Sequence, residues 1–370
     1  MSRTYFLVRE SYQRESGGVE KEYDALSILL RRQRKSVEIL SKTEILECAR
    51  PEDIVYVQEE GRLSREYLEW ARSLLLNGVI VLEKNVFALP SKFRPKHPNY
   101  RMILLSRDGA YRYALRGVFF QNQQDFALIV PNVINNCKNN FDFKSVSLEL
   151  ENRFRILRAG RDDPRKWSSY ELEFCENLFS NQSKYSALLT LVGCPKQYQR
   201  ESKNSNLSVS YLNYTLNLEE LYRLHKYYLL YSKIGETFGN TLFEAAANNL
   251  RVIFIFNLSW DCGAIEYLEK YYSNFRIFEI SNTKLIDIDK LFGAQNDTSE
   301  NRINEINIFS EMLLNENYAG LELQIPSLKS SVKYLSGLGR KYGVNWWRIL
   351  IALTKEFIRE KDWIKLVKLP

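Results

Sequence analysis

The most informative stretch of the sequence is Lys233-Ile-Gly-Glu-Thr-Phe-Gly-Asn-Thr-Leu-Phe-Glu-Ala-Ala-Ala-Asn-Asn249, in which a loop flanked by glycines opens a helix. The helix is predicted over Thr241–Asn248, and an apolar strand over Arg251–Phe256 follows it. Backbone N–H groups at the start of such a helix point at an anion, and the helix dipole favours negative charge there. Glu236 lies in the loop, where it can accept hydrogen bonds from sugar hydroxyls, and Glu244 lies on the helix, where it can bind a ribose. Taken alone, either carboxylate is explained better as a helix cap or a solvated side chain.

Strands and helices are predicted to alternate along the whole chain. The first half has predicted strands at Thr4–Val8, Asp53–Gln58, Val79–Leu82, Arg101–Ser106, Val118–Phe120 and Phe126–Val130, with helices at Val19–Arg31 and Leu63–Leu76. The second half adds strands at Phe154–Leu157 and Ser186–Val192 and helices at Ser169–Phe179 and Leu218–His225. This alternation favours parallel sheets covered by helices, and therefore an α/β fold of two Rossmann-like halves in tandem. The cleft between the halves is the expected ligand site.

The length and composition agree with a globular protein of two domains. A chain of 370 residues exceeds one ordinary core, and its 45% hydrophobic and 26% charged residues are typical of soluble proteins. The Asn-rich segment Pro131–Phe143 is poor in pattern and is predicted to link the two halves. We therefore expect an N-terminal domain at 1–140, a second domain at 141–325 and a helical C-terminal segment at 326–370.

The C-terminal segment carries the whole net charge of +7, because it contains ten Lys or Arg and three Asp or Glu. Val332–Lys368 is predicted to be helical, with Gly337, Gly339 and Gly343 breaking its early part. One interpretation is a terminal helix that packs an aromatic stripe on the body of the protein. The alternative is that 344–370 docks on an anionic membrane surface through its basic residues.

Several classes of protein are disfavoured by what the sequence lacks. We expect no signal peptide and no membrane span, because no apolar run is long enough for either. The five cysteines are scattered, and with two histidines they offer neither the spacing of a zinc site nor a Cys/His catalytic pair. Free thiols in a reducing compartment are expected, which indicates a cytoplasmic protein.

Two further clusters carry charge or allow close backbone approach. One follows a predicted strand directly and reads Arg158-Ala-Gly-Arg-Asp-Asp-Pro-Arg-Lys-Trp167. Gly160 can form a tight turn there, and Arg161 and Lys166 place two positive charges where they would neutralise a diphosphate, although a basic loop taken alone is more often solvated surface. The other, Ser16-Gly-Gly-Val-Glu20, lies between the first strand and a helix. Its glycines allow a phosphate or an acceptor to approach the backbone, although an ordinary turn explains them equally well.

Together the three clusters resemble those of retaining GT-B glycosyltransferases of the family 4 type, also called glycosyl transferases group 1. The family's motifs match at Gly17-Gly18, at Gly160-Arg161…Lys166, and at Glu236-Thr-Phe238-Gly239…Glu244-Ala245. Further matches are Val130-Pro-Asn132 to its link strand, Tyr211-Leu212 to its base-binding turn, and Gly263-Ala-Ile-Glu266 to a later Gly-x-x-Glu. The resemblance is strong over 154–267 and thin before that. It implies two Rossmann-like domains facing a central cleft, with C-terminal helices that cross back to the N-terminal domain.

The resemblance also implies a reaction and the residues that perform it. The family moves a hexose from a nucleotide-diphosphate sugar to a glycan or lipid-linked acceptor with retention of configuration, as in polysaccharide biosynthesis, and needs no metal or other cofactor. The implied catalytic residues are Glu236 at the donor sugar and Arg161 and Lys166 at the pyrophosphate. The implied donor-binding residues are Gly18, Gly160, Tyr211, Leu212, Thr237, Phe238, Gly239, Asn240 and Glu244. On the acceptor side, His97 is the candidate.

Departures from the family pattern keep other interpretations open. Asn249 and Arg251 stand where the family has Gly and Pro, although Asn can end a helix in the left-handed conformation nearly as well as Gly. One alternative is a non-catalytic glycan-binding or scaffold protein with a GT-B fold. A nucleic-acid-binding protein is a further alternative, but no recognition motif is present and the chain before the basic segment is neutral.

Overall fold

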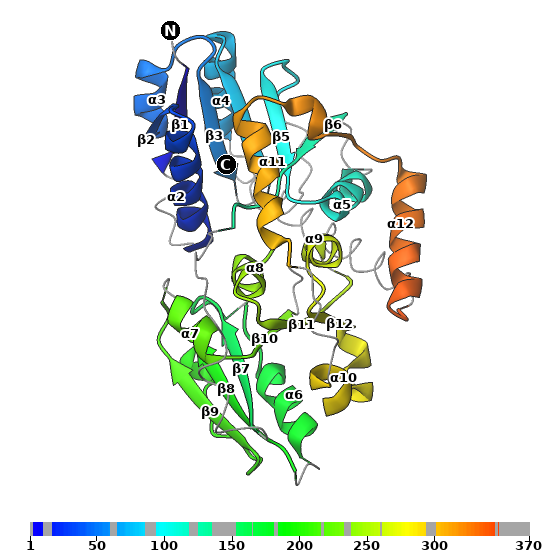
Figure 1. Ribbon diagram of the computed structural model, residues 1–370. Coiled ribbons are helices and arrows are strands. Elements are labelled where there is room, and N and C mark those ends of the chain that lie inside the picture. The colour runs from blue at the N-terminus through cyan, green and yellow to red at the C-terminus, as the bar shows by residue number, and fades with distance from the viewer. Residues whose placement is uncertain are drawn as a thin grey trace, which may run out of the picture. The chain divides into compact units, whose positions relative to one another are not determined.

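The computed structural model describes residues 3–9, 17–59, 65–85, 94–117, 125–134, 153–164, 166–180, 184–215, 218–232, 238–259, 261–293, 301–344 and 347. The chain forms two compact units (Figure 1). Unit 1 comprises Met1–Ile134, Ser259–Glu266 and Ile306–Pro370, and unit 2 comprises Asn135–Leu258 and Tyr267–Glu305. The predicted strand Val118–Phe120 and the predicted boundary at residue 140 lie outside the described residues and stay predictions.

Unit 1 is built on a sheet whose strands follow the order β13-β6-β5-β4-β3-β1-β2. The strands are β1 (Thr4–Val8), β2 (Ser36–Leu40), β3 (Ile54–Glu59), β4 (Ile80–Asn85), β5 (Tyr100–Leu104), β6 (Phe126–Ile129) and β13 (Glu322–Gln324). β13 is antiparallel to β6, whereas the other neighbouring strands pair in parallel. The direction of strand order reverses between β1 and β3, as in flavodoxin-like sheets.

Helices cover both faces of this sheet. They are α2 (Gly17–Arg32), α3 (Lys42–Cys48), α4 (Arg65–Leu76), α5 (Arg107–Gly117) and α11 (Asn307–Leu314), and α12 (Leu328–Lys341) packs on α5. Alternate residues of each strand enter different cores, because successive side chains point to opposite faces. Phe6 and Val8 of β1 pack with α3, α4 and α5 on one face, while Tyr5 and Leu7 pack with α2 and α11 on the other.

Unit 2 contains a parallel sheet in the order β12-β11-β10-β7-β8-β9. Its strands are β7 (Arg153–Ala159), β8 (Ser186–Val192), β9 (Leu207–Leu212), β10 (Tyr227–Ser232), β11 (Arg251–Phe256) and β12 (Phe275–Glu279). The helices are α6 (Ser169–Phe179), α7 (Glu219–Leu224), α8 (Asn240–Ala247), α9 (Gly263–Tyr271, whose first turn belongs to unit 1) and α10 (Ile288–Phe292). This is the strand order of a Rossmann sheet, in which the order reverses between β7 and β10. The predicted α/β fold with two Rossmann-like units is therefore confirmed.

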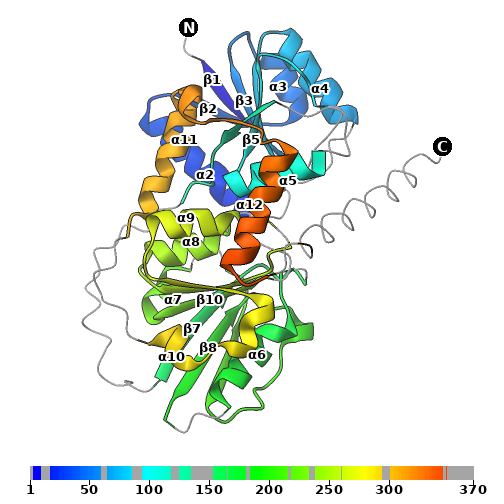
Figure 2. The ribbon, with the colours of Figure 1, turned by 90° about the vertical axis from the view of Figure 1, so that its right-hand side faces the viewer.

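The described part of the C-terminal segment belongs to unit 1, where α12 packs against α5 (Figure 2). The rings of Tyr111 and Tyr334 stack there with centroids 4.1 Å apart. The prediction that Gly337 and Gly339 break this helix is wrong, because α12 runs through both and ends before Gly343, which has a φ of 67°. A helical glycine costs about 1 kcal/mol relative to alanine, and the packing of α12 on α5 offsets that cost.

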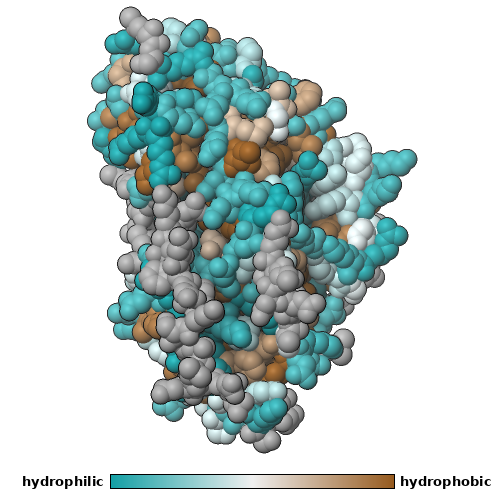
Figure 3. All heavy atoms as spheres, viewed as in Figure 1, coloured by the Kyte–Doolittle hydropathy of each residue, from teal (hydrophilic) through white to brown (hydrophobic). Residues whose placement is uncertain are grey.

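The surface is mainly hydrophilic, with separate hydrophobic patches on the face seen in Figure 3. Scattered apolar residues of this kind are normal on a folded protein. Among the helices of the described residues, none combines the length and the apolar stretch that crossing a bilayer requires. Four cysteines, Cys48, Cys175, Cys194 and Cys262, are free thiols.

One of the two histidines, His225, is built into unit 2 at the end of α7. It is 6% exposed, and its Nδ1 donates to the Leu221 carbonyl oxygen at 2.7 Å. Its Nε2 lies 2.8 Å from the Thr190 hydroxyl and accepts from it, since the carbonyl contact requires the proton on Nδ1. Burial lowers the pKa of this imidazole below its ordinary value, so the folded protein keeps it neutral.

This burial predicts a loss of stability in mild acid. The unfolded chain takes up the His225 proton near its ordinary pKa of about 6.5, whereas the folded chain takes it up only at lower pH. The free energy of unfolding should therefore fall as the pH drops from about 6.5, with a slope of at most about 1.4 kcal/mol per pH unit. For the His225→Gln variant, denaturant unfolding at several pH values should show a free energy of unfolding that falls less steeply below a pH of about 6.5, because the titrating group is gone. The His97→Asn variant should keep the full slope, and an unchanged slope in His225→Gln would contradict the assignment.

Candidate functional site

Unit 2 brings two of the predicted clusters to one edge of its sheet. β7 and β10 pair in parallel, with Ile156 beside Tyr227 and Leu157 beside Tyr228. The loop with Gly160 follows the carboxyl end of β7, and the loop that leads to α8 follows the carboxyl end of β10. Ligands of open α/β sheets bind outside the carboxyl ends of the strands where the strand order reverses. The reversal in unit 2 falls between these two strands, so the Gly160 loop and the amino end of α8 border the expected binding position.

Two glycines let the strand ends approach closely. The Gly160 N–H donates to the Val192 carbonyl oxygen at 3.1 Å, and the Gly193 N–H donates to the Leu212 carbonyl oxygen at 2.9 Å. Gly193 has a φ of +74°, and a Cβ atom on it would lie 2.1 Å from the Gly160 carbonyl oxygen. No side chain can occupy that space, so glycine at 193 is required for the loops after β7, β8 and β9 to meet.

A buried arginine supports the loop after β7. Arg158 is 3% exposed, its guanidinium lies 4.6 Å from the centre of the Trp167 ring, and its Nη2 donates to the Lys166 carbonyl oxygen at 3.0 Å. The Trp167 indole N–H donates to the Arg161 carbonyl oxygen at 2.6 Å. Arg161 and Lys166 are themselves partly exposed. Arg158 and Trp167 therefore fix the backbone at the two positions that were predicted to hold a pyrophosphate.

The amino end of α8 has the geometry of an anion site. Gly239 precedes the helix with φ 70° and ψ 70°, a left-handed conformation that glycine adopts without strain. Phe238 is buried and stacks on Phe243 with ring centroids 4.2 Å apart, which holds the entry to the helix. Gly239, the N-cap residue, has no side chain that could cap the helix. The helix dipole favours negative charge at this end, so a ligand anion can bind there.

Two tyrosines from neighbouring elements support α8, and one of them, Tyr222, bonds Glu244. Glu244 is 7% exposed, and its Oε2 accepts a hydrogen bond from the Tyr222 hydroxyl at 3.1 Å. The Tyr228 hydroxyl lies 3.0 Å from the Ala159 carbonyl oxygen and 2.7 Å from the Thr241 hydroxyl. These contacts join the end of β7 to the first turn of α8. Tyr228 was not singled out from the sequence, because a tyrosine inside an apolar strand gives no sign that its hydroxyl serves a site.

The other predicted donor residues of unit 2 are placed less directly. Glu236 and Thr237 lie outside the described residues, so their roles stay predictions. Asn240 begins α8. The Tyr211 hydroxyl accepts from the Arg200 backbone N–H and donates to the Arg200 carbonyl oxygen, so this side chain is used within the fold. Leu212 at the end of β9 is 40% exposed.

Gly18 and His97 belong to unit 1, and the structure does not bring them together. Gly17 and Gly18 form the first residues of α2, where the sequence had indicated a loop before the helix. They follow β1 and so lie near the carboxyl edge of the sheet. His97 precedes β5 at the amino edge, and its Nδ1 accepts the Asn99 N–H at 3.1 Å.

The Gly263-Ala-Ile-Glu266 motif is bonded within unit 1. The Glu266 carboxylate accepts the Arg107 N–H at the start of α5 at 3.0 Å, and burial raises the pKa of Glu266. Asp108 accepts the Cys262 N–H at 2.9 Å and pairs with the fully buried Arg112 at 2.8 Å. The motif is thus tied to a buried ionic cluster that sequence spacing did not reveal.

The two departures from the family pattern fit the fold. Asn249 adopts a φ of 62°, so the predicted left-handed helix end is confirmed. Arg251 at the start of β11 donates to the Phe292 and Gly293 carbonyl oxygens at 3.0 and 2.9 Å. Within the described part of the chain, no group of three or more His, Cys, Asp or Glu side chains is placed to hold a metal ion.

Comparisons with known proteins identify the fold. No family model and no curated protein sequence matches the chain. Among solved structures, it is similar to HepE of Anabaena in complex with UDP and glucose, at 14% identity and a TM-score of 0.54, over 86% of this chain and 99% of HepE. A glycosyltransferase of Rickettsia africae matches at 15% identity and a TM-score of 0.55, over 94% of this chain and 99% of its own.

A third similar structure is trehalose-6-phosphate synthase, studied for glycosyl transfer with retention. It matches at 12% identity with a TM-score of 0.50, over 75% of this chain and 73% of its own. Identities this low show a common fold. The chain therefore has the GT-B fold of these glycosyltransferases.

Proposed function

We propose that this protein is a glycosyltransferase that moves a hexose from a nucleotide-diphosphate sugar to a glycan or lipid-linked acceptor with retention of configuration. The observation that carries the proposal is the meeting of the Arg161 loop and the amino end of α8 beside the strand-order reversal of unit 2. Both features suit a diphosphate. The fold is shared with HepE, which was solved with UDP and glucose, and this supports a uridine nucleotide as the first donor to test.

The proposed chemistry rests on stabilising the leaving group. Arg161 and Lys166, together with the N–H groups of α8, would neutralise the charge that grows on the diphosphate as the glycosidic bond breaks. Glu244 accepts a hydrogen bond from the Tyr222 hydroxyl, and in this proposal its carboxylate also binds the ribose hydroxyls. In this proposal the basic side chains do the work of a metal, so neither a metal nor another cofactor is needed.

We further propose that Glu236, with the backbone of Phe238 and Gly239, holds the donor sugar. The departing phosphate would act as the base that deprotonates the acceptor, so no protein nucleophile is assigned. Similarity to trehalose-6-phosphate synthase, studied for transfer with retention, supports this stereochemistry. Free thiols at four cysteines agree with a cytoplasmic location. Whether the basic segment 344–370 contacts an anionic membrane stays a separate proposal.

The diphosphate site can be tested by charge removal. Arg161→Gln should weaken UDP binding by about 1.5–3 kcal/mol, which is a loss of affinity of roughly 10- to 150-fold, because a hydrogen bond to a charged group is lost. Uridine lacks the diphosphate, so its affinity should be unchanged. Calorimetric titration of both ligands measures the difference, and EDTA should alter neither. The matched control is Lys184→Gln, which removes an exposed positive charge of unit 2. Equal losses for UDP and uridine would place the effect elsewhere.

The ribose contact makes a different prediction. Glu244→Gln keeps the shape of the side chain but replaces a charged acceptor, and UDP affinity should fall roughly tenfold. UDP and 2′-deoxy-UDP should then bind about equally well, since the contact they distinguish is lost. The control Glu201→Gln changes an exposed carboxylate of the same unit and should bind UDP like the parent protein. A variant that still prefers UDP by the original factor would remove Glu244 from the ribose.

Glu236 separates catalysis from nucleotide binding. Glu236→Ala should abolish release of UDP from UDP-glucose, with or without added glycan acceptor, because the donor sugar is no longer held. Its affinity for UDP alone should stay near that of the parent protein. Undiminished turnover would end the role proposed for Glu236. UDP binding with no turnover in the parent protein would instead favour the non-catalytic glycan-binding or scaffold alternative.

A further inference from the structure

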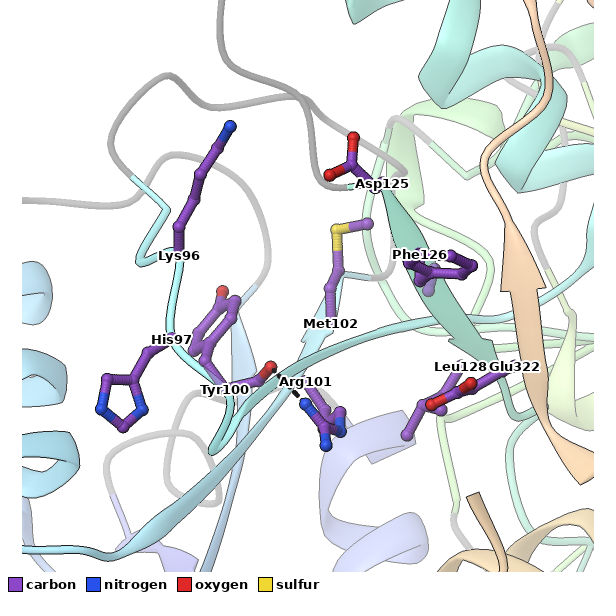
Figure 4. A pocket seen from close by; sticks show the side chains of 10 residues that line it. Lys96, His97, Tyr100, Arg101, Met102, Asp125, Phe126, Leu128 and Glu322 are labelled. Atoms are coloured by element: carbon purple, nitrogen blue, oxygen red, sulfur yellow. Dashed lines mark hydrogen bonds between the residues drawn. The ribbon is translucent and has the colours of Figure 1, made fainter. Parts of the chain in front are cut away.

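A cavity of about 400 Å³ opens at the amino edge of the unit 1 sheet (Figure 4). It lies between the first residues of β5 and β6. In the described residues these strands pair where Ile103 meets Leu128 and Leu104 meets Ile129, whereas Phe126 pairs with β13 on the other side. The strands thus diverge toward their amino ends, and the space between them is the cavity. Its volume falls within the range of small-ligand sites.

The charges around the cavity balance. Lys96 and Arg101 are cations, and Asp125 and Glu322 are anions, all on the lining. An anionic ligand would meet two carboxylates, and a cationic ligand would meet an ammonium and a guanidinium. A neutral molecule whose groups both donate and accept hydrogen bonds can use all four side chains. Sugar hydroxyls have this property.

Two polar groups of the lining are buried without a hydrogen-bond partner among the described residues. One is the hydroxyl of Tyr100, a residue that is 4% exposed, and the other is Nε of Arg101. In contrast to Nε, the Nη1 atom of Arg101 has a partner, because it donates to the Pro98 carbonyl oxygen. A buried polar group without a partner is costly, so such groups call for an explanation. Tyr100 and Arg101 are consecutive residues of β5 and point to opposite faces of the sheet, Tyr100 into the core that contains α4 and Arg101 toward the Tyr318 ring, so two different hydroxyls of a ligand would serve them.

An exposed aromatic ring completes the chemistry. Phe126, the first residue of β6, is 55% exposed and lines the cavity. In Figure 4, Tyr100 and Phe126 stand on either side of Met102, while the His97 ring points away from them. Aromatic rings offer a large, rigid apolar face, and the C–H face of a pyranose can stack on it. Apolar stacking combined with both charge signs suits a sugar better than a purely apolar ligand.

We propose that this cavity binds a neutral oligosaccharide, apart from the site of transfer. The proposal does not depend on the transfer reaction, because it rests on unit 1 side chains alone. β5 spans five residues, so the amino and carboxyl edges of the sheet lie about 17 Å apart. A glycan in this cavity is therefore held at a distance from the carboxyl edge, where ligands of such sheets bind.

The test uses the full chain on an array of neutral oligosaccharides of glucose, galactose, mannose and N-acetylhexosamines. The best binder is then titrated by calorimetry, with inorganic phosphate as a second probe. Phe126→Ala should lower the affinity for the oligosaccharide at least tenfold, a loss of about 1.4 kcal/mol or more in binding free energy. Glu322→Gln should weaken it several-fold. Both variants should bind UDP like the parent protein, which shows that they fold. The control Leu76→Ala removes a different exposed apolar side chain of unit 1 and should change nothing.

Three results would overturn the proposal. The first is that no neutral oligosaccharide on the array binds. The second is that Phe126→Ala and Glu322→Gln bind the oligosaccharide like the parent protein, which would locate the glycan elsewhere. The third is that phosphate binds and Phe126→Ala leaves phosphate affinity intact, which would make the cavity an anion site. Loss of UDP binding with retained glycan binding would contradict the proposed transfer function alone, so the two proposals can fail separately.

Discussion

The candidate site of unit 2 depends on the close approach of two backbone segments at Gly160 and Gly193. The Gly160 carbonyl oxygen occupies the space that a Cβ atom on residue 193 would need, at a separation of 2.1 Å. Any side chain there would push the ends of β7 and β8 apart. The Arg161 loop would then move relative to α8. A shift of about 1 Å in a cationic side chain is enough to weaken its contact with a diphosphate. The electrostatic contacts proposed for the site therefore depend on this steric constraint at the edge of the sheet.

The residues that bind a ligand are positioned by others that a motif does not contain. The Arg158 guanidinium packs on the Trp167 ring and bonds the Lys166 carbonyl oxygen, so it stabilises the fold and is not a ligand contact. Tyr228 links the end of β7 to α8, and Tyr222 orients Glu244. A short motif shows which side chains can touch a ligand. Their distances and angles come from buried partners that are distant in sequence, and such partners are as necessary to function as the motif itself.

Apolar strands and amphipathic helices were predicted well because their signal is local. β8, β11 and α6 agree with their predicted bounds, since each has a continuous apolar run or a clear helical period. α5 was missed because its charged residues Asp108 and Arg112 suggest an exposed segment. In the structure both are buried, and Arg112 lies 3.5 Å from Asp261 across 149 residues of sequence. Local patterns cannot show a pairing over that separation, and the same limit hid Tyr228 and the cavity between β5 and β6.

The ionic cluster of unit 1 gives the Gly263–Glu266 motif a second constraint. Asp261 pairs with Arg116 at 3.2 Å, and the Cys262 N–H and the Glu266 carboxylate are bonded to the start of α5. Removing one partner of a buried ion pair leaves an uncompensated charge, which costs far more than the pair contributes when intact. The segment Ser259–Glu266 is therefore fixed to α5 although chain of unit 2 flanks it on both sides. Resemblance alone would assign this motif to donor binding. In the structure its position is fixed by contacts with α5, so a substitution in the motif would also disturb unit 1.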